Sequence, residues 1–243
     1  MDFLKDKIND IRVFILAGIS RLPSTIAAVL LIVGMFTANY AALFFLLGFL
    51  IITPLVAFLV NLISEYAIDS IDPTLLYTIK GACMVNIPFQ RISNRPSEEY
   101  TFQICSEWLA MFAFFIGYMT TNALDLQSTA SDQTSDPKLD PKYQRRMSQL
   151  KVSLATIIVV AVLVIGYRIV GTKCDYPANW LIGSIMLICL AGYGAAGYGW
   201  YQFLTNTIAK GHPQLADLFG IANRLITPDA GKDQPVVCLP QKA

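Results

Sequence analysis

Residues 26–63, IAAVLLIVGMFTANYAALFFLLGFLIITPLVAFLVNLI, decide the fold of this chain. The stretch contains 38 residues and not one Asp, Glu, Lys, Arg or His. A helix of about 20 apolar residues crosses a bilayer core of about 30 Å, so this stretch is long enough for almost two crossings. A buried helix in a soluble protein rarely reaches this length without a charge. The composition therefore predicts that this part of the chain lies in a membrane.

The middle of the stretch predicts a turn between two helices. Residues 37–40 are Thr, Ala, Asn and Tyr. Asn tolerates turn conformations, and Tyr prefers the membrane–water interface. We predict a hairpin in the segment 24–63, with arms at about 24–36 and 41–63 and a kink at Pro54. The hairpin can span the bilayer or re-enter it, because both of its ends lie on one side in either case.

The composition of the whole chain fits a protein that crosses a membrane several times. Of its 243 residues, 55% are hydrophobic and only 14% are charged, against about 25% charged in soluble domains. A net charge of +1 gives no field that favours nucleic acid or an acidic substrate. Charges of both signs in the first 20 residues, without a cleavage site, indicate that the first apolar arm is retained.

Three further apolar runs are predicted to cross the membrane. They occupy 107–124, 152–170 and 180–204. Trp180 and Trp200 frame the last run and lie 20 residues apart, about 30 Å of helix, so one indole would lie at each interface. Arg168, at the end of the second run, is expected to extend to the head groups. These three residues are the predicted interface anchors.

The remaining segments are polar or amphipathic. In segment 1–23, Leu4, Ile8, Ile11 and Ile15 share one face of a helix, and the segment 205–243 shows similar spacing before an extended tail. Segment 64–106 is predicted to be a polar loop with short elements, and 171–179 a short loop. Segment 125–151 is predicted to be a solvated linker, or alternatively a strap that docks on a partner. The sequence thus predicts an all-α polytopic integral membrane protein with about five transmembrane helices, the first two as a hairpin, and interfacial amphipathic helices at both ends.

Neither the orientation nor the disulfide state follows from the sequence. Five crossings put the two termini on opposite sides, but the 18 Lys and Arg residues divide nine and nine between those sides. Of five cysteines, Cys83, Cys174 and Cys238 lie in polar segments. Two of these could pair, and the odd number does not identify a compartment.

The sequence offers no set of residues for catalysis or metal binding. Its one histidine, His212, precedes Pro213 and has no Ser, Cys or carboxylate at a useful spacing. No Cys and His residues lie at zinc-ligand spacing, and no ionisable residue lies in the middle of a predicted span, as a transporter would require. We therefore predict a protein that is not an enzyme and that binds no cofactor, metal or small-molecule substrate.

Residues 192–199, GYGAAGYG, contain two motifs that do not fit their surroundings. The pattern G-x-G-x-x-G follows no strand, which excludes dinucleotide binding. Gly-Tyr-Gly occurs twice but without the Thr-Val that precedes it in a potassium-channel filter. Small residues at four-residue spacing instead predict a face on which another helix packs, formed by Ala191, Ala195 and Gly199 together with Gly192 and Ala196. A channel or pore-forming protein remains the alternative function.

Several short stretches share a pattern with one group of viral proteins. They are RLP at 21–23, PS at 96–97, WLA at 108–110, FFIGY at 114–118, TNA at 121–123, ADLFGI at 216–221 and CLP at 238–240. In these the chain resembles membrane proteins of large nucleocytoplasmic double-stranded DNA viruses, notably those that infect algae. The resemblance implies a structural minor capsid protein that tethers the internal viral membrane to the icosahedral shell.

The same resemblance implies where the protein is found and what it contacts. The expected location is the internal membrane of the virion, and the host endomembrane derived from the endoplasmic reticulum during assembly. The expected partners are the lipid bilayer and other minor or major capsid proteins, without nucleic acid. Polar segments at 64–106, 126–151 and 227–243 are long enough to reach a protein lattice.

Overall fold

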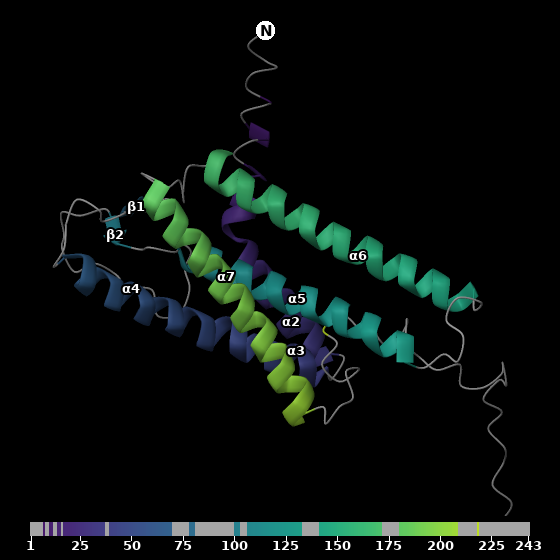
Figure 1. The fold of residues 1–243 in the computed structure, drawn as a ribbon. Coiled ribbons are helices and arrows are strands. Elements are labelled where there is room, and N and C mark those ends of the chain that lie inside the picture. The colour runs from purple at the N-terminus through teal and green to yellow at the C-terminus, as the bar shows by residue number, and fades with distance from the viewer. Residues whose placement is uncertain are drawn as a thin grey trace, which may run out of the picture.

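The computed structural model describes residues 7, 10–11, 14–15, 17–36, 39–69, 78–80, 100–102, 106–132, 141–171, 180–208 and 218. Nearly all of these residues are helical, so the predicted all-α class is confirmed for this part of the chain. Two three-residue strands, β1 (Thr78–Lys80) and β2 (Tyr100–Phe102), add an antiparallel pair in which Ile79 faces Thr101. Figure 1 shows the helices packed as one bundle.

The first two helices form a tight hairpin. Helix α2 (Leu22–Phe36) ends and α3 (Tyr40–Leu47) begins at the predicted turn. The Asn39 side chain accepts a hydrogen bond from the Ala42 N–H at 3.4 Å, which caps α3. A Cβ atom on Gly34 would lie 3.1–3.2 Å from the side chains of Leu43 and Ala42, so a glycine here lets the two helices approach closely.

The expected kink at Pro54 takes the form of a π-helical turn. Helix α3 continues without a break through η1 (Gly48–Ile52) into α4 (Thr53–Asp69). Pro54 has no N–H to donate to the preceding turn. The helix widens just before it, and both the N–H and the hydroxyl of Thr53 donate to the Gly48 carbonyl, the hydroxyl at 2.8 Å.

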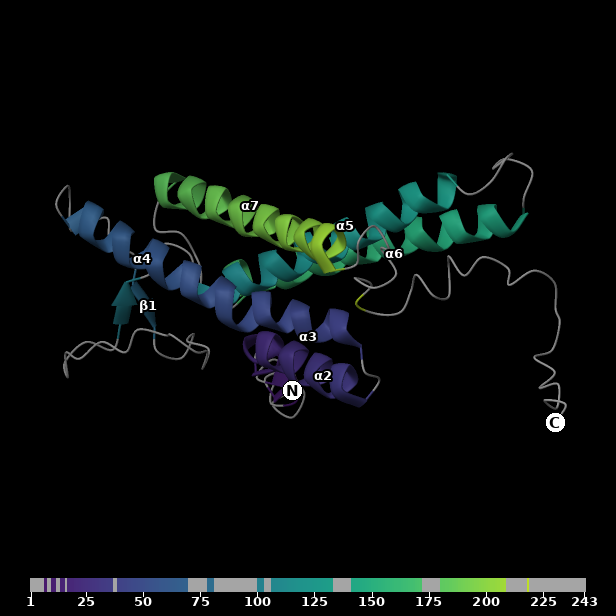
Figure 2. The same ribbon diagram turned by 90° about the horizontal axis from the view of Figure 1, so that it is seen from below.

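Helix α5 (Glu107–Asp132) is the central element of the bundle. Its residues 107–114 are all buried, and α7 (Trp180–Phe203), α4 and α6 (Pro141–Gly166) pack around it. The π turns η4 (Tyr167–Gly171) and η5 (Leu204–Ile208) extend α6 and α7. Figure 2 shows α5 between α7 on one side and α3 and α4 on the other.

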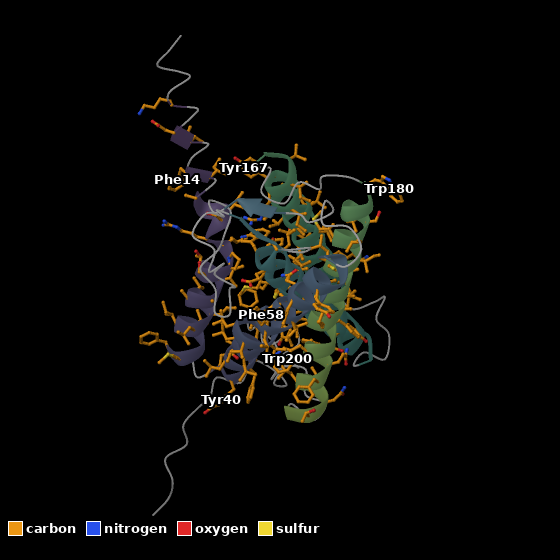
Figure 3. The ribbon with its side chains drawn as sticks, turned by 90° about the vertical axis from the view of Figure 1, so that its left-hand side faces the viewer. Phe14, Tyr40, Phe58, Tyr167, Trp180 and Trp200 are labelled. Carbon is orange, nitrogen blue, oxygen red and sulfur yellow. The ribbon has the colours of Figure 1, made fainter. Side chains whose placement is uncertain are left out.

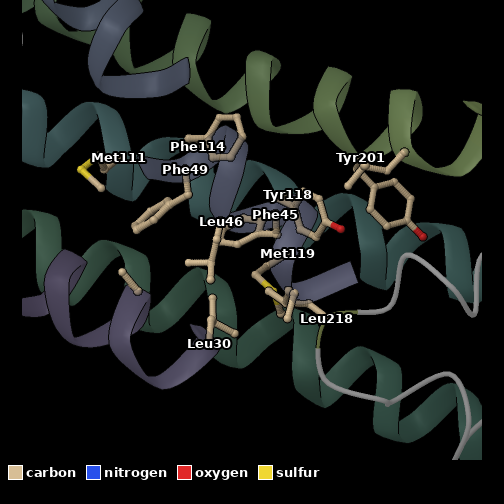
Figure 4. Close-up of a cluster of buried hydrophobic side chains, with 13 residues drawn as sticks. Leu30, Phe45, Leu46, Phe49, Met111, Phe114, Tyr118, Met119, Tyr201 and Leu218 are labelled. Atoms are coloured by element: carbon tan, nitrogen blue, oxygen red, sulfur yellow. The ribbon is translucent and has the colours of Figure 1, made fainter. Parts of the chain in front are cut away.

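An aromatic cluster joins α3 to α5. The Phe45 ring lies 4.8 Å from Tyr118, 5.3 Å from Phe49, and 5.9 and 6.0 Å from Phe114 and Phe115, measured between ring centroids. Figure 4 shows Phe45, Phe49, Phe114 and Tyr118 in one buried cluster that also contains Leu46 and Met111. Edge-on and tilted aromatic pairs of this kind stabilise packing by about 0.5–1.5 kcal/mol each beyond the area they bury.

The predicted linker at 125–151 is much shorter than expected, because the flanking helices extend into it. Helix α5 continues to Asp132, and α6 already begins at Pro141. A proline is well tolerated in the first turn of a helix, where its missing N–H has no partner in any case. The polar ends of α5 and α6 lie side by side and extend past the start of α3 (Figure 2).

Among the residues that the structure describes, two helices are long and apolar enough to cross a membrane, and the five predicted crossings stay a prediction. The two helices are Tyr40–Ile63 and Leu150–Gly171, while the apolar α2 is shorter than a crossing requires. Thr120, Thr121 and Asn122 make α5 more polar. His212, Cys83, Cys174, Cys238 and most of 205–243 lie outside the described residues.

Candidate functional site

The most specific contacts of the described chain are polar joints between helices, and the first lies at the start of α5. The Trp108 indole N–H donates to the Ile19 carbonyl at 2.9 Å, and Trp108 is only 1% exposed. Pro23, four residues after Ile19, lacks the N–H that would bond this carbonyl within a helix. The proline therefore frees an acceptor, and the tryptophan of another helix binds it.

Arg168, in the π turn after α6, is the third residue in this contact. Its guanidinium carbon lies 4.4 Å from the centroid of the Trp108 ring, and the residue is 1% exposed. On the same ring Phe112 stacks with a centroid distance of 5.1 Å. A cation over an indole face away from water is worth about 2 kcal/mol or more. The prediction that Arg168 extends to the head groups is wrong, because the guanidinium is turned inward onto Trp108.

A buried carboxylate lies next to this joint. Glu107, the first residue of α5, is 4% exposed, and no described residue forms a hydrogen bond with its Oε2 atom. Ser106 precedes it and caps the helix, since its Oγ accepts from the Leu109 N–H at 3.2 Å. The described residues contain no group of three or more His, Cys, Asp or Glu that could hold a metal ion.

The opposite end of α5 is joined to α7 by tyrosine. The Tyr201 hydroxyl donates to Oδ2 of Asp125 at 2.9 Å, and its ring meets Tyr118 edge-on at 5.2 Å. The Thr121 hydroxyl donates a hydrogen bond to the Gly117 carbonyl, one turn earlier in α5, at 2.7 Å. This polar side chain therefore has its partner within its own helix. Polar residues of α5 thus lie inside the bundle and bond there.

Trp200 forms a second joint between an indole and a backbone carbonyl. Its N–H donates to the Phe44 carbonyl at 3.1 Å, and the ring lies against Gly48, where a Cβ atom would come within 2.7 Å of the indole nitrogen. Trp200 is half-buried, whereas Trp180 is 82% exposed. The two predicted anchors lie at opposite ends of α7 (Figure 3), but Trp200 also ties α7 to α3.

Helices α5 and α7 meet at glycines that the sequence analysis did not select. A Cβ atom on Gly117 would collide with the Gly194 carbonyl oxygen, and one on Gly197 with the Phe114 carbonyl oxygen. Contact this close between two backbones is possible only without side chains. Tyr193, Gly197 and Tyr201, four residues apart, are all buried and form the face of α7 that α5 covers.

The five residues predicted to pack a helix lie elsewhere on α7. They are all exposed, and a Cβ atom on Gly192 or Gly199 would meet no atom within 4 Å. The residues in question are Ala191, Gly192, Ala195, Ala196 and Gly199. Small residues of α7 do allow a neighbouring helix to pack closely, as predicted. The face of α7 that α5 covers, however, is the one with Gly197 and not the predicted one.

Both Gly-Tyr-Gly triplets lie inside the continuous helix α7. The backbone carbonyls of a helix interior accept hydrogen bonds from the following turn. A selectivity filter needs a ring of carbonyls that face the ion instead. The triplets therefore do not form a filter in this fold.

The outer surface of the bundle is strongly apolar. Only 39% of the apolar window in Tyr40–Ile63 and 11% of that in Leu150–Gly171 is buried. Large exposed side chains on α6 and its π turn are Val152, Ile158, Val159, Val160, Val162, Leu163 and Val170. Aromatic residues lie toward the two ends: Figure 3 shows the exposed Phe14 and Trp180 and the half-buried Tyr167 near one end, and the exposed Tyr40 near the other.

No family model, no curated protein and no solved structure matches this chain.

Proposed function

We propose that this chain is an integral membrane protein with a structural role, a minor capsid protein that tethers the internal membrane of a large DNA virus to its capsid shell. The observation that carries the membrane part is the exposure of α6. Seven large apolar residues of α6 and η4 are exposed although the helix packs in a bundle, and Leu163 is 65% exposed.

The free energy of this exposure favours lipid over water as the surroundings. A Val, Leu or Ile side chain gains about 1.5–3 kcal/mol when it leaves water completely. For seven partly exposed residues the sum is on the order of 10 kcal/mol, as large as the whole stability of a typical domain. The chain's polar side chains support the same proposal from inside, because Glu107, Asn122 and Arg168 are buried.

The distribution of aromatic residues agrees with a bilayer. Tyrosine and tryptophan concentrate at membrane–water interfaces, where the ring meets the acyl chains and the polar atom meets water. Trp180 and Tyr167 lie at one end of the bundle and Tyr40 at the other, with the apolar surfaces of α4 and α6 between them (Figure 3).

The structural role is supported by what the buried polar groups do. The Trp108, Trp200 and Tyr201 hydrogen bonds join one helix to another. These hydrogen bonds fix the helices relative to one another, and a protein that connects a membrane to a shell needs such rigidity. The virion assignment itself rests on the resemblance of the short stretches to viral membrane proteins, and the projecting ends of α5 and α6 are where a shell protein would be met.

Two measurements test the proposal in sequence. The expressed chain should stay with the membrane fraction after extraction with alkaline carbonate, and release into the supernatant would refute membrane insertion. In purified particles, a photo-cross-linker placed at residue 129, in the projecting end of α5, should couple to a capsid protein. Insertion without any cross-link to the shell would refute the tether while leaving the membrane assignment intact.

A further inference from the structure

The start of α6 projects beyond the apolar part of the bundle. The helix begins at Pro141, whereas its membrane-crossing candidate begins at Leu150. The nine residues between 141 and 149 therefore add about 13 Å of helix outside the crossing. Figures 1 and 2 show this part lying beside the end of α5 and extending past the start of α3.

This projecting part is basic and α6 has no acidic residue. Lys142, Arg145 and Arg146 lie three and four residues apart, so they share one side of the helix, and the exposed Lys151 follows. The acidic residues of the adjoining α5 end are Asp125, which accepts a hydrogen bond from Tyr201, and Asp132.

Two features indicate that these cations serve binding rather than the stability of the helix. Basic residues in the first turns oppose the helix dipole, at about 0.3–1 kcal/mol each. The opposite end of the same helix offers no comparable charge, because Arg168 is buried against Trp108. The two ends of this helix therefore differ: its basic residues other than Arg168 all lie in its first eleven positions, and the last of these, Lys151, is exposed.

The positions match the head-group layer of a bilayer. Measured along the helix from Leu150, Arg146 lies about 6 Å, Arg145 about 7.5 Å and Lys142 about 12 Å away. Each head-group layer is about 5–7 Å thick, and charges interact over a Debye length of about 8 Å in physiological salt. All three charges therefore lie within reach of lipid phosphates.

We infer that the start of α6 binds the head groups of anionic phospholipids, and that the leaflet at this end of the bundle is the anionic one. The inference rests on the proposed membrane function. Guanidinium and ammonium groups bind phosphate oxygens directly, and a negative head group near the start of the helix also complements its dipole. A juxtamembrane cluster of cations gains up to about a fivefold preference for anionic lipid per charge.

The test measures lipid selectivity of the full chain. The protein is reconstituted into phosphatidylcholine vesicles, and electron spin resonance compares how strongly it immobilises spin-labelled phosphatidylserine and spin-labelled phosphatidylcholine. We expect a severalfold preference for phosphatidylserine that declines as salt is added. If the unaltered protein immobilises the two spin-labelled lipids equally, the inference is overturned.

A pair of variants separates charge from the specific shape of arginine. The variant Lys142→Gln, Arg145→Gln and Arg146→Gln should lose most of the preference, whereas Arg145→Lys and Arg146→Lys should retain it. An equal loss in both variants would refute head-group binding, since lysine carries the same charge but cannot replace a bidentate protein contact. Failure of the unaltered protein to enter the vesicles would instead refute the proposed function.

Discussion

The closest contact between helices yields the sharpest prediction, because the same substitution can be made on two faces of one helix. Gly197 lies against the backbone of α5, where an added Cβ would meet the Phe114 carbonyl and the Tyr118 amide nitrogen. Gly199, two residues later in the same helix, has nothing within 4 Å of that position. Gly197→Ala and Gly199→Ala therefore differ only in what the new methyl group contacts.

The magnitude follows from two opposing effects. Replacing a helical glycine by alanine stabilises the helix by about 1 kcal/mol, and this gain is common to both variants. At Gly197 the obstacle is backbone, which no side-chain rotation can relieve, so α5 and α7 must move apart at a cost of about 1–3 kcal/mol or more. The two variants should differ by about 3 kcal/mol, with Gly197→Ala the less stable.

The assay is thermal unfolding in detergent, followed by circular dichroism. A difference of about 3 kcal/mol corresponds to about 6–12 °C in Tm for a chain of this size. Gly199→Ala should unfold at or slightly above the temperature of the unaltered protein. Equal Tm values for the two variants, or a lower value for Gly199→Ala, would show that α5 does not pack on the Gly197 face.

Three further predictions concern the polar joints, each measured by the same unfolding assay. Trp108→Phe removes a buried hydrogen bond donor and should destabilise the protein by about 1–3 kcal/mol, while Trp180→Phe, at an exposed position, should change it by less than about 0.5 kcal/mol; equal effects would contradict the joint. Arg168→Lys should lower the free energy of unfolding by at least about 1 kcal/mol, because an ammonium stacks less well than a guanidinium on the indole. An unchanged Tm would instead favour the original expectation that this residue extends to the lipid head groups. Tyr201→Phe should cost about 1.5–3 kcal/mol by removing the bond to the Asp125 carboxylate, and a Tm unchanged within error would show that water replaces it.

The helices themselves were predictable from the sequence because their cause is local. The uncharged run at 26–63 and the polar break at 37–40 together predict two helices with a turn, and the structure has helices at Leu22–Phe36 and Tyr40–Asp69. Asn39 caps the second of these with its own side chain, which is also a local interaction. The ends of α5 and α6 were predicted less well, since polar residues suit an exposed helix as well as a loop.

The polar joints could have been partly foreseen. Pro23 signals that the Ile19 carbonyl lacks a helical partner, but nothing in the local sequence indicates that Trp108, 89 positions away, supplies the bond. Arg168 illustrates the same point, because a basic residue at the end of an apolar run normally extends toward water. The packing of its guanidinium against the Trp108 ring appears only in the tertiary structure.

By itself, the sequence determined that the chain forms long apolar helices, because apolar content and backbone hydrogen bonding are properties of each segment. The tertiary structure alone decided which side of each helix faces its neighbours. In α7 nearly every side is apolar or small, so there is no contrast in polarity to distinguish the Gly197 face, which α5 covers, from the exposed Gly199 face. That choice depends on how closely two backbones fit together, and this fit appears only when the helices are brought together.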